Sequence, residues 1–250
     1  MICFPNCKIN LGLFITEKRP DGYHSLESIF LPGPLTDVLE ITPRTDHECV
    51  IKQYNATFDI PLEKHSCYKA WHILHEHHDI HGVNIHLIKK IPSGAGLGGG
   101  SADAAFALMM MNEIFSLSLS QIELLHYAAQ LGSDDAFFIH NKPCFLKGRG
   151  HELMPMDWSF PYRIEISSPD VNISTVEAYS TVTPKPSTIN LLDIPSLAKE
   201  EWKNVITNDF QAGAIKRFPI IQEHIDRMYQ NGAFYAAMSG SGSSVFGLFD

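Results

Sequence analysis

The chain has 250 residues, of which 44% are hydrophobic, and its formal net charge is −9. This apolar content is enough to bury a sizeable core, in one large domain or two small ones. Acidic residues outnumber basic ones, and lysine and arginine form no cluster along the chain. The sequence therefore lacks the basic surface that binds the phosphate backbone of a nucleic acid, and no nucleic-acid partner is expected.

The N-terminal stretch and the cysteines indicate a cytoplasmic protein. The first ten residues, MICFPNCKIN, lack the basic and apolar regions of a signal peptide. No apolar run approaches the roughly 20 residues of a membrane helix, so no membrane partner is expected. The five cysteines form no C-x-x-C pair and are odd in number, as in a reduced chain. We expect a monomer or a weak homodimer.

The first third of the chain is predicted to contain strands around one helix. Strands are predicted at 7–15, 25–32, 37–43, 47–54 and 82–92. The triplet Pro-Asp-Gly at residues 20–22 marks a turn after the first of them. A helix is predicted over 64–78, with one apolar side formed by Cys67, Ala70, Trp71 and Leu74.

The middle of the chain is predicted to be mainly helical. A glycine-rich loop leads into a helix over 101–115, which is apolar almost all round and therefore buried. Ser120 is the expected N-cap of a helix that ends at Leu131, and Glu123 completes a capping box. A turn leading into apolar sequence at 131–139 and a strand with a turn at 144–156 follow.

From residue 157 onward the sequence predicts a second group of strands and helices. The predicted order is a strand at 162–169, a short helix within 171–182, a mobile stretch at 183–190, helices near 197–209 and 219–231, and two strands within 234–250. The last two strands flank a second glycine-rich turn. These elements predict an α+β fold with two lobes, residues 1–156 and 157–250.

The stretch IPSGAGLGGGSADAA, residues 91–105, keeps many glycines, which suits a backbone that bends tightly or approaches a ligand closely. Gly94, Gly96 and Gly99 match the dinucleotide fingerprint G-x-G-x-x-G. The strand before them alternates instead of being apolar throughout, which argues against that fingerprint. A Walker A loop would end in Gly-Lys-Ser/Thr, and a protein-kinase loop would need V-A-I-K, H-R-D and D-F-G elsewhere.

With these motifs excluded, two possibilities are left for a glycine loop between a strand and a buried helix. The loop either binds no ligand or binds a phosphate. Successive N–H groups and the positive end of the helix dipole would converge on one point, which favours a phosphate. Ser101, in the first helical turn, can offer its hydroxyl to a phosphate or to Mg²⁺, and can also cap the helix.

Several segments, in order along the chain, resemble those of the GHMP small-molecule kinases. The glycine stretch resembles the family's phosphate-binding loop, and PNCKIN at 5–10 its N-terminal P-x-K-x-N strand. SGSGSSVF at 239–246 resembles the C-terminal glycine motif of the family. PDGYH at 20–24 and LGSDD at 131–135 are similar to segments of one member, which phosphorylates a cytidine diphosphate-linked methylerythritol.

The resemblance implies an ATP-binding N-terminal lobe, a smaller C-terminal lobe and an active site in the cleft between them. It implies ATP and Mg²⁺ as cofactors and direct transfer of the γ-phosphoryl group to the 2-hydroxyl of the methylerythritol unit, in the non-mevalonate isoprenoid pathway. Family members acting on mevalonate or homoserine are the alternative. The ATP contacts carried over are Pro92, Gly94, Gly96, Leu97, Gly98, Gly99, Gly100, Ser101 and Ala102.

Lys8 and Asp134 match the family's catalytic pair. The attacking hydroxyl must lose its proton, and the resemblance assigns Asp134 as the general base. Asp135 is the fallback, in a position that is usually apolar in the family. Lys8 would be a buried cation that orients the hydroxyl and neutralises developing charge. The ordinary alternatives are a turn aspartate and a lysine on an edge strand.

The substrate contacts implied by the resemblance come from both predicted lobes. Tyr23 and His24 match the family's cytidine contacts, through a stacking face and a polar ring edge. Tyr179 stands where the family has the second aromatic residue of a cytosine sandwich, and Thr175 where it has a substrate contact. Asn10 is expected to bind substrate as well.

The chain departs from the family in three places. Lys64-His65-Ser66 replaces a frequent Asp-Asn, which leaves the adenine contacts unassigned. The family usually continues past its C-terminal glycine motif, so we expect a C-terminal lobe that is shortened or completed differently. A run of histidines contains no H-E-x-x-H motif and favours a solvated helix face over a metal site; it comprises His72, His75, His77, His78 and His81. Near Ser101, the one obvious acid is Asp103.

Overall fold

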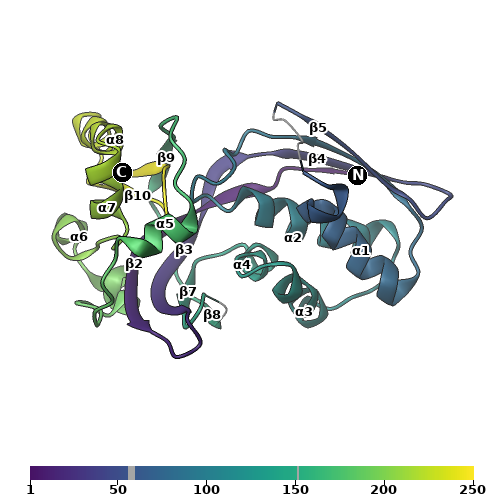
Figure 1. The fold of residues 1–250 in the computed structure, drawn as a ribbon, viewed down its shortest axis with the longest axis horizontal. Helices are drawn as coiled ribbons and strands as arrows, with labels where there is room; N and C mark the ends of the chain where they lie inside the picture. Colours follow the sequence, from purple (N-terminus) through teal and green to yellow (C-terminus); the bar gives the residue numbers. More distant parts are fainter. Residues whose placement is uncertain (56–59, 151) are drawn as a thin grey trace. The chain divides into compact units, whose positions relative to one another are not determined.

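A computed structural model describes residues 1–55, 60–150 and 152–250 (Figure 1). Their contacts divide the chain into two units. Unit 1 comprises Met1–Cys7, Leu35–Ile91 and Gly98–Asn141, and unit 2 comprises Lys8–Pro34, Pro92–Leu97 and Lys142–Asp250. The units thus interleave along the sequence. The lobe boundary expected near residue 156 lies inside unit 2 and stays a prediction.

Unit 1 is a four-stranded sheet with helices on one side. The strand order is β1 (Ile2–Cys3), β4 (Val38–Pro43), β6 (Val83–Ile88) and β5 (Cys49–Tyr54). Strands β5 and β6 run parallel, and the other pairs are antiparallel. The predicted alternation on β6 is confirmed, because Val83, Ile85 and Leu87 are buried while the residues between them are less so.

The helices of unit 1 follow from local sequence signals. They are the 3₁₀ helix η1 (Leu62–Lys64), α1 (Ser66–His78), α2 (Gly99–Ile114), α3 (Gln121–Leu131) and α4 (Asp135–His140). Figure 1 shows α1 and α2 against the sheet, with α3 and α4 on their far side. The capping box of Ser120 and Glu123 forms as predicted. Helix α2 begins two residues before its predicted start because Gly98 takes the capping position.

Unit 2 contains two sheets. One has the order β2 (Asn6–Lys18), β3 (His24–Thr36), β7 (Cys144–Lys147) and β8 (Glu152–Pro155), where β2 begins and β3 ends in residues of unit 1. The other has the order β10 (Tyr235–Met238), β11 (Val245–Phe249) and β9 (Arg163–Ser167). Helix α8 (Ile220–Gln230) lies against this second sheet and buries Ile221, Ile225 and Met228 (Figure 1).

The remaining helices of unit 2 are α5 (Thr175–Ser180), the 3₁₀ helix η2 (Leu191–Ser196), α6 (Lys199–Val205) and α7 (Gln211–Arg217). The sequence missed α7, whose interior glycine lowers its helix propensity. A side chain at Gly213 would lie 2.4 Å from the hydroxyl of Thr181, so close packing explains the glycine. It also missed α4, which is too short to show a helical period.

The stretch 183–190, predicted to be mobile, forms no helix or strand, and the Lys185 amide donates to the Ile15 carbonyl at 3.0 Å. Within the described part of the chain, none of the helices has both the length and the apolar character that crossing a membrane requires.

Candidate active site

The first half of the glycine loop, in unit 2, is bound to two other motifs that the sequence singled out. The Lys8 amide of β2 donates to the Leu97 carbonyl at 2.9 Å. The Ser239 hydroxyl, from the C-terminal glycine motif, donates to the Gly96 carbonyl at 2.9 Å. A Cβ at Gly96, where φ is +78°, would lie 2.0 Å from the Ser239 carbonyl oxygen. Only glycine therefore fits where these segments meet.

Lys8 is buried, as the sequence predicted, at 4% exposure. Its ammonium donates to Oδ1 of Asn10 at 2.6 Å and lies 4.3 Å from the ring centroid of Phe30. The other end of the Asn10 amide donates to the Ser28 hydroxyl at 2.9 Å, which fixes the orientation of Oδ1 toward the lysine. The side chains of Lys8 and Asn10 are thus brought together and held in place.

Two of the three side chains expected to contact a base, His24 and Tyr179, meet in unit 2. His24, at the start of β3, stacks on Tyr179 of α5 with ring centroids 4.8 Å apart and an angle of 23° between the rings. Tyr23 is 55% exposed, and the Arg149 guanidinium lies 3.6 Å from its ring centroid. Thr175 is exposed at the first position of α5. Arg149 is a cationic neighbour that the sequence did not indicate.

The second half of the loop, in unit 1, ends in the N-terminus of α2. Gly98 caps the helix with φ at +70°. The first helical hydrogen bond runs from the Ala102 amide to the Gly98 carbonyl at 2.9 Å. The amides of Gly99, Gly100 and Ser101 precede this bond and are the ones that can bind an anion. The amide of Ala102, expected among the ATP contacts, is engaged within the helix.

A pocket in unit 1 adjoins this helix start. Its lining includes Lys64 of η1, Ser66 and Lys69 of α1, and Ser101 of α2. Two ammonium groups beside a helix N-terminus make a favourable environment for phosphate. Lys64 and Ser66 stood out in the sequence only as a departure from the family pattern. Lys69 carried no local signal, because its place depends on how α1 packs.

Asp135 lines the same pocket and is 3% exposed. Burial raises the pKa of its carboxyl to about 7, and the charge of Asp134 adds to the rise, while a hydrogen bond from Ser101 opposes it. A Cβ at Gly132 would lie 2.5 Å from the Asp135 carboxylate, which explains the glycine of the LGSDD segment. Ser101 and Asp135 thus place two oxygen-bearing side chains next to each other in the pocket.

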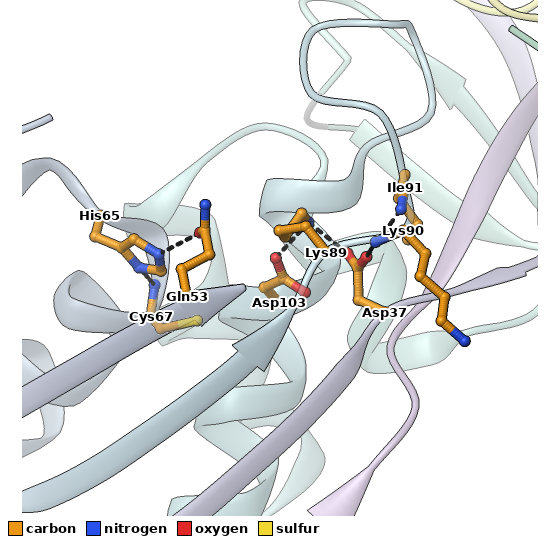
Figure 2. Close-up of polar contacts among 8 residues, drawn as sticks. All are labelled: Asp37, Gln53, His65, Cys67, Lys89, Lys90, Ile91 and Asp103. Carbon is orange, nitrogen blue, oxygen red and sulfur yellow. Dashed lines mark hydrogen bonds and ion pairs between the residues drawn. The ribbon is translucent and has the colours of Figure 1, made fainter. Parts of the chain in front are cut away.

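A second buried carboxylate, Asp103 of α2, is used differently (Figure 2). The Lys89 ammonium donates to Oδ2 of Asp103 at 2.7 Å and also to Asp37. Asp37 accepts the amides of Lys90 and Ile91 through Oδ1, at 2.5 and 2.9 Å. This cluster ties the residues that precede the glycine loop to α2. Asp103 is therefore paired with Lys89 inside this cluster.

Burial and the neighbouring charges shift the pKa values of Asp103 and Lys89 in opposite directions. Burial raises the pKa of Asp103 to about 7, and Lys89 opposes that rise. For Lys89, burial lowers the pKa, but the charges and hydrogen bonds of Asp103 and Asp37 outweigh it and leave the pKa raised. The lysine is accordingly charged at neutral pH.

His65 holds the start of α1 (Figure 2). Its Nδ1 accepts the Cys67 amide at 3.1 Å, so Nε2 carries the hydrogen and faces Oε1 of Gln53 at 3.2 Å. Burial, with a smaller contribution from Lys89, lowers the pKa of His65 to about 4. The ring is therefore a neutral N-cap in the Lys64-His65-Ser66 segment.

Two family models match the chain. Residues 65–142 match the N-terminal domain of the GHMP kinases, and residues 190–250 match the C-terminal domain. The chain belongs to the GHMP kinase family. The α+β GHMP kinase fold expected from the sequence is thereby confirmed, and this GHMP kinase is an ATP-dependent small-molecule kinase.

Two relatives of high sequence identity carry the name of one kind of GHMP kinase. The chain is 48% identical to a 4-diphosphocytidyl-2-C-methyl-D-erythritol kinase of Parabacteroides distasonis and 49% identical to one of Bacteroides fragilis. Each match covers 100% of this chain and 92% of the relative.

Solved structures give the same comparison. A crystal structure of 4-(cytidine 5'-diphospho)-2C-methyl-D-erythritol kinase superposes with a TM-score of 0.85 at 30% identity, covering 99% of this GHMP kinase and 90% of that chain. The mevalonate kinase of Methanococcus jannaschii superposes with a TM-score of 0.70 at 16% identity, covering 100% and 90%, and shows the fold alone.

Proposed function

We propose that this GHMP kinase uses ATP to phosphorylate the 2-hydroxyl of 4-diphosphocytidyl-2-C-methyl-D-erythritol, as a step of the non-mevalonate isoprenoid pathway. The observation that carries the proposal is near-half identity, over the whole chain, to kinases named for that substrate. The stacked pair of His24 and Tyr179 supports it, because a cytosine ring needs an aromatic surface with a polar edge nearby.

The aromatic pair constrains how a base would bind. Rings stacked with centroids 4.8 Å apart leave no space for a third ring between them, since each stacking layer needs about 3.5 Å. Cytosine would therefore stack on an outer face of the pair, or displace the His24 ring from Tyr179. In either case the imidazole supplies a hydrogen-bonding edge for the base.

The start of α2 and the pocket beside it would hold the ATP phosphates. Amides of Gly99, Gly100 and Ser101 donate to phosphate oxygens, and Lys64 and Lys69 balance their charge. The Ser101 hydroxyl and the Asp135 carboxylate fit Mg²⁺, which prefers oxygen ligands. When bound, the ion neutralises charge on the phosphates.

The catalytic roles remain those that the family resemblance implies. Asp134 accepts the proton of the substrate hydroxyl as general base. Lys8, held toward Oδ1 of Asn10, orients the hydroxyl and stabilises the charge that develops during direct transfer. Lys8 belongs to unit 2 and Asp134 to unit 1, and their cooperation is part of the proposal.

The direct test supplies ATP and the cytidylated alcohol to the purified protein and measures ADP and the 2-phosphate product. We expect turnover, and competition by CMP against the alcohol. Turnover of mevalonate or homoserine without inhibition by CMP would support a different small-alcohol kinase and reject the proposed substrate.

Substitutions of the aromatic residues test the cytidine site separately. Tyr179→Ala should raise KM for the cytidylated alcohol by about tenfold or more and leave KM for ATP unchanged, because a stacked base contributes about 1–3 kcal/mol. Tyr54→Ala, which changes a partly exposed tyrosine of unit 1, is the matched control. An unchanged KM in Tyr179→Ala would contradict the stacking role.

A further inference from the structure

Three side chains able to ligate a metal gather at the C-terminal end of α1. His47 comes from the turn between β4 and β5, His75 from the last turn of α1, and Asp79 from its C-cap. Their ligating atoms all lie within 4.8 Å of one another. Ligands of one zinc ion in tetrahedral geometry are about 3.3 Å apart, so an approach of about 1.5 Å closes the set. His47 and Asp79 are exposed, and rotation of their side chains can provide this approach.

The helix side of the cluster is fixed by hydrogen bonds. The Asp79 amide donates to the His75 carbonyl at 3.1 Å, with Asp79 in the left-handed region at φ +47°. The indole of Trp71 donates to the His81 carbonyl at 3.2 Å. These bonds hold the residues after α1 against the helix and keep Asp79 beside His75.

His75 is oriented for metal binding. Its Nδ1 lies 2.6 Å from the Ile80 carbonyl oxygen, and because a carbonyl only accepts, Nδ1 carries the hydrogen. Nε2 is then left with the lone pair that a metal requires. The ring also stacks on Trp71 with centroids 4.7 Å apart and 13° between the planes. A backbone carbonyl fixing the far nitrogen is a usual support for a histidine ligand.

Backbone hydrogen bonds hold the turn that carries His47 against the residues that follow α1. The Gly82 amide donates to the Asp46 carbonyl at 2.6 Å, and the Val83 amide to the Glu48 carbonyl at 2.9 Å. A Cβ at Gly82 would lie 2.3 Å from the Glu48 carbonyl oxygen, so the two segments are in close contact. The His47 and His75 rings consequently meet, with centroids 5.4 Å apart.

Charge favours a cation at this position. Asp79 contributes a carboxylate, and the C-terminal end of α1 carries the negative end of its helix dipole. Arg44 is the one arginine in the turn between β4 and β5. Its guanidinium is already paired with Asp46 and lies 3.8 Å from the Glu48 carboxylate. A bound dication would therefore lie among groups that attract it.

We propose that His47, His75 and Asp79 bind a divalent transition-metal ion of the zinc class, with water completing the coordination shell. Two imidazole nitrogens and one carboxylate suit Zn²⁺, Co²⁺ or Ni²⁺ better than Mg²⁺, which prefers oxygen ligands throughout. The ion would join the end of α1 to the β4–β5 turn and stabilise unit 1. The proposal does not depend on the identity of the kinase substrate.

The test uses the full chain without an affinity tag, stripped of metal by a chelator that is then removed. Zn²⁺ is titrated by calorimetry, and thermal unfolding is followed with and without the ion. We expect one saturable site and a higher Tm with Zn²⁺, because an ion that binds only the folded state stabilises it. Mg²⁺ at the same concentration should leave the Tm unchanged.

Substitutions locate the site. His47→Ala and Asp79→Asn, both at exposed positions, should weaken Zn²⁺ binding by about tenfold or more and remove the rise in Tm. His72→Ala is the matched control, since His72 lies exposed on the same helix beside Glu76. Absence of saturable binding would overturn the proposal, as would equal losses in His72→Ala and His47→Ala.

Discussion

Asp103 and Asp135 are both buried in unit 1, and burial raises the pKa of each to about 7, yet their surroundings differ. Asp103 faces Lys89 inside a closed cluster with Asp37. Asp135 lines a pocket with Ser101, beside two lysines. A perturbed pKa therefore does not by itself identify a functional site, and the accessibility of the carboxylate to a ligand distinguishes the two.

The largest expected effect is on kcat, and it distinguishes the role of Asp134 from that of its neighbour Asp135. Asp134→Asn should lower kcat by about 10²–10⁴-fold, because it removes the proposed general base. Steady-state kinetics at saturating ATP and Mg²⁺ measure the loss, and circular dichroism checks the fold. If Asp134→Asn retains activity and Asp135→Asn loses it even at high Mg²⁺, Asp135 is the base instead.

The second prediction concerns the closed cluster of Asp103. Lys89→Met should lower the free energy of unfolding by about 3–5 kcal/mol, because it leaves two buried carboxylates without their cation. Urea denaturation measures the change. Lys90→Ala, an exposed neighbour, should stay within about 0.5 kcal/mol of the parent. Equal stability of both variants would show that the cluster does not hold unit 1 together.

The third prediction uses the pKa of Asp103 itself. Its pKa is raised in the folded state, so the ionisation of Asp103 lowers the free energy of unfolding of the parent as the pH rises from about 4 to 7. Asp103→Asn removes this loss. The free energy of unfolding of the variant should therefore increase relative to the parent over that pH range. A pH-independent difference between the two proteins would contradict the assignment.

The smallest expected effect concerns Asp135 as a metal ligand. Asp135→Asn should raise the Mg²⁺ concentration needed for half-maximal activity by about tenfold, because an amide is a weaker ligand than a carboxylate. Asp103→Asn should leave that concentration unchanged. A titration of activity with Mg²⁺ at fixed ATP measures both variants, and identical shifts in the two would remove Asp135 from the metal site.

Much of the fold could be predicted because its signals are local. The period of two in β6, the capping box at Ser120 and the turn after β2 depend on neighbouring residues. Helix α4 escaped prediction because six residues are too few to show a period. The histidine-rich pattern on α1 predicted a solvated face and could not include His47, which only the contact with the β4–β5 turn brings near.

The sequence by itself determined the family and the glycine-rich loop before α2, because motif spacing and local patterning carry that information. The tertiary structure decided which partner each charged or aromatic side chain meets: Lys89 with Asp37, His24 with Tyr179, Asp135 with Ser101. These partners are distant in the chain, and their pairing follows from the packing of whole elements against one another.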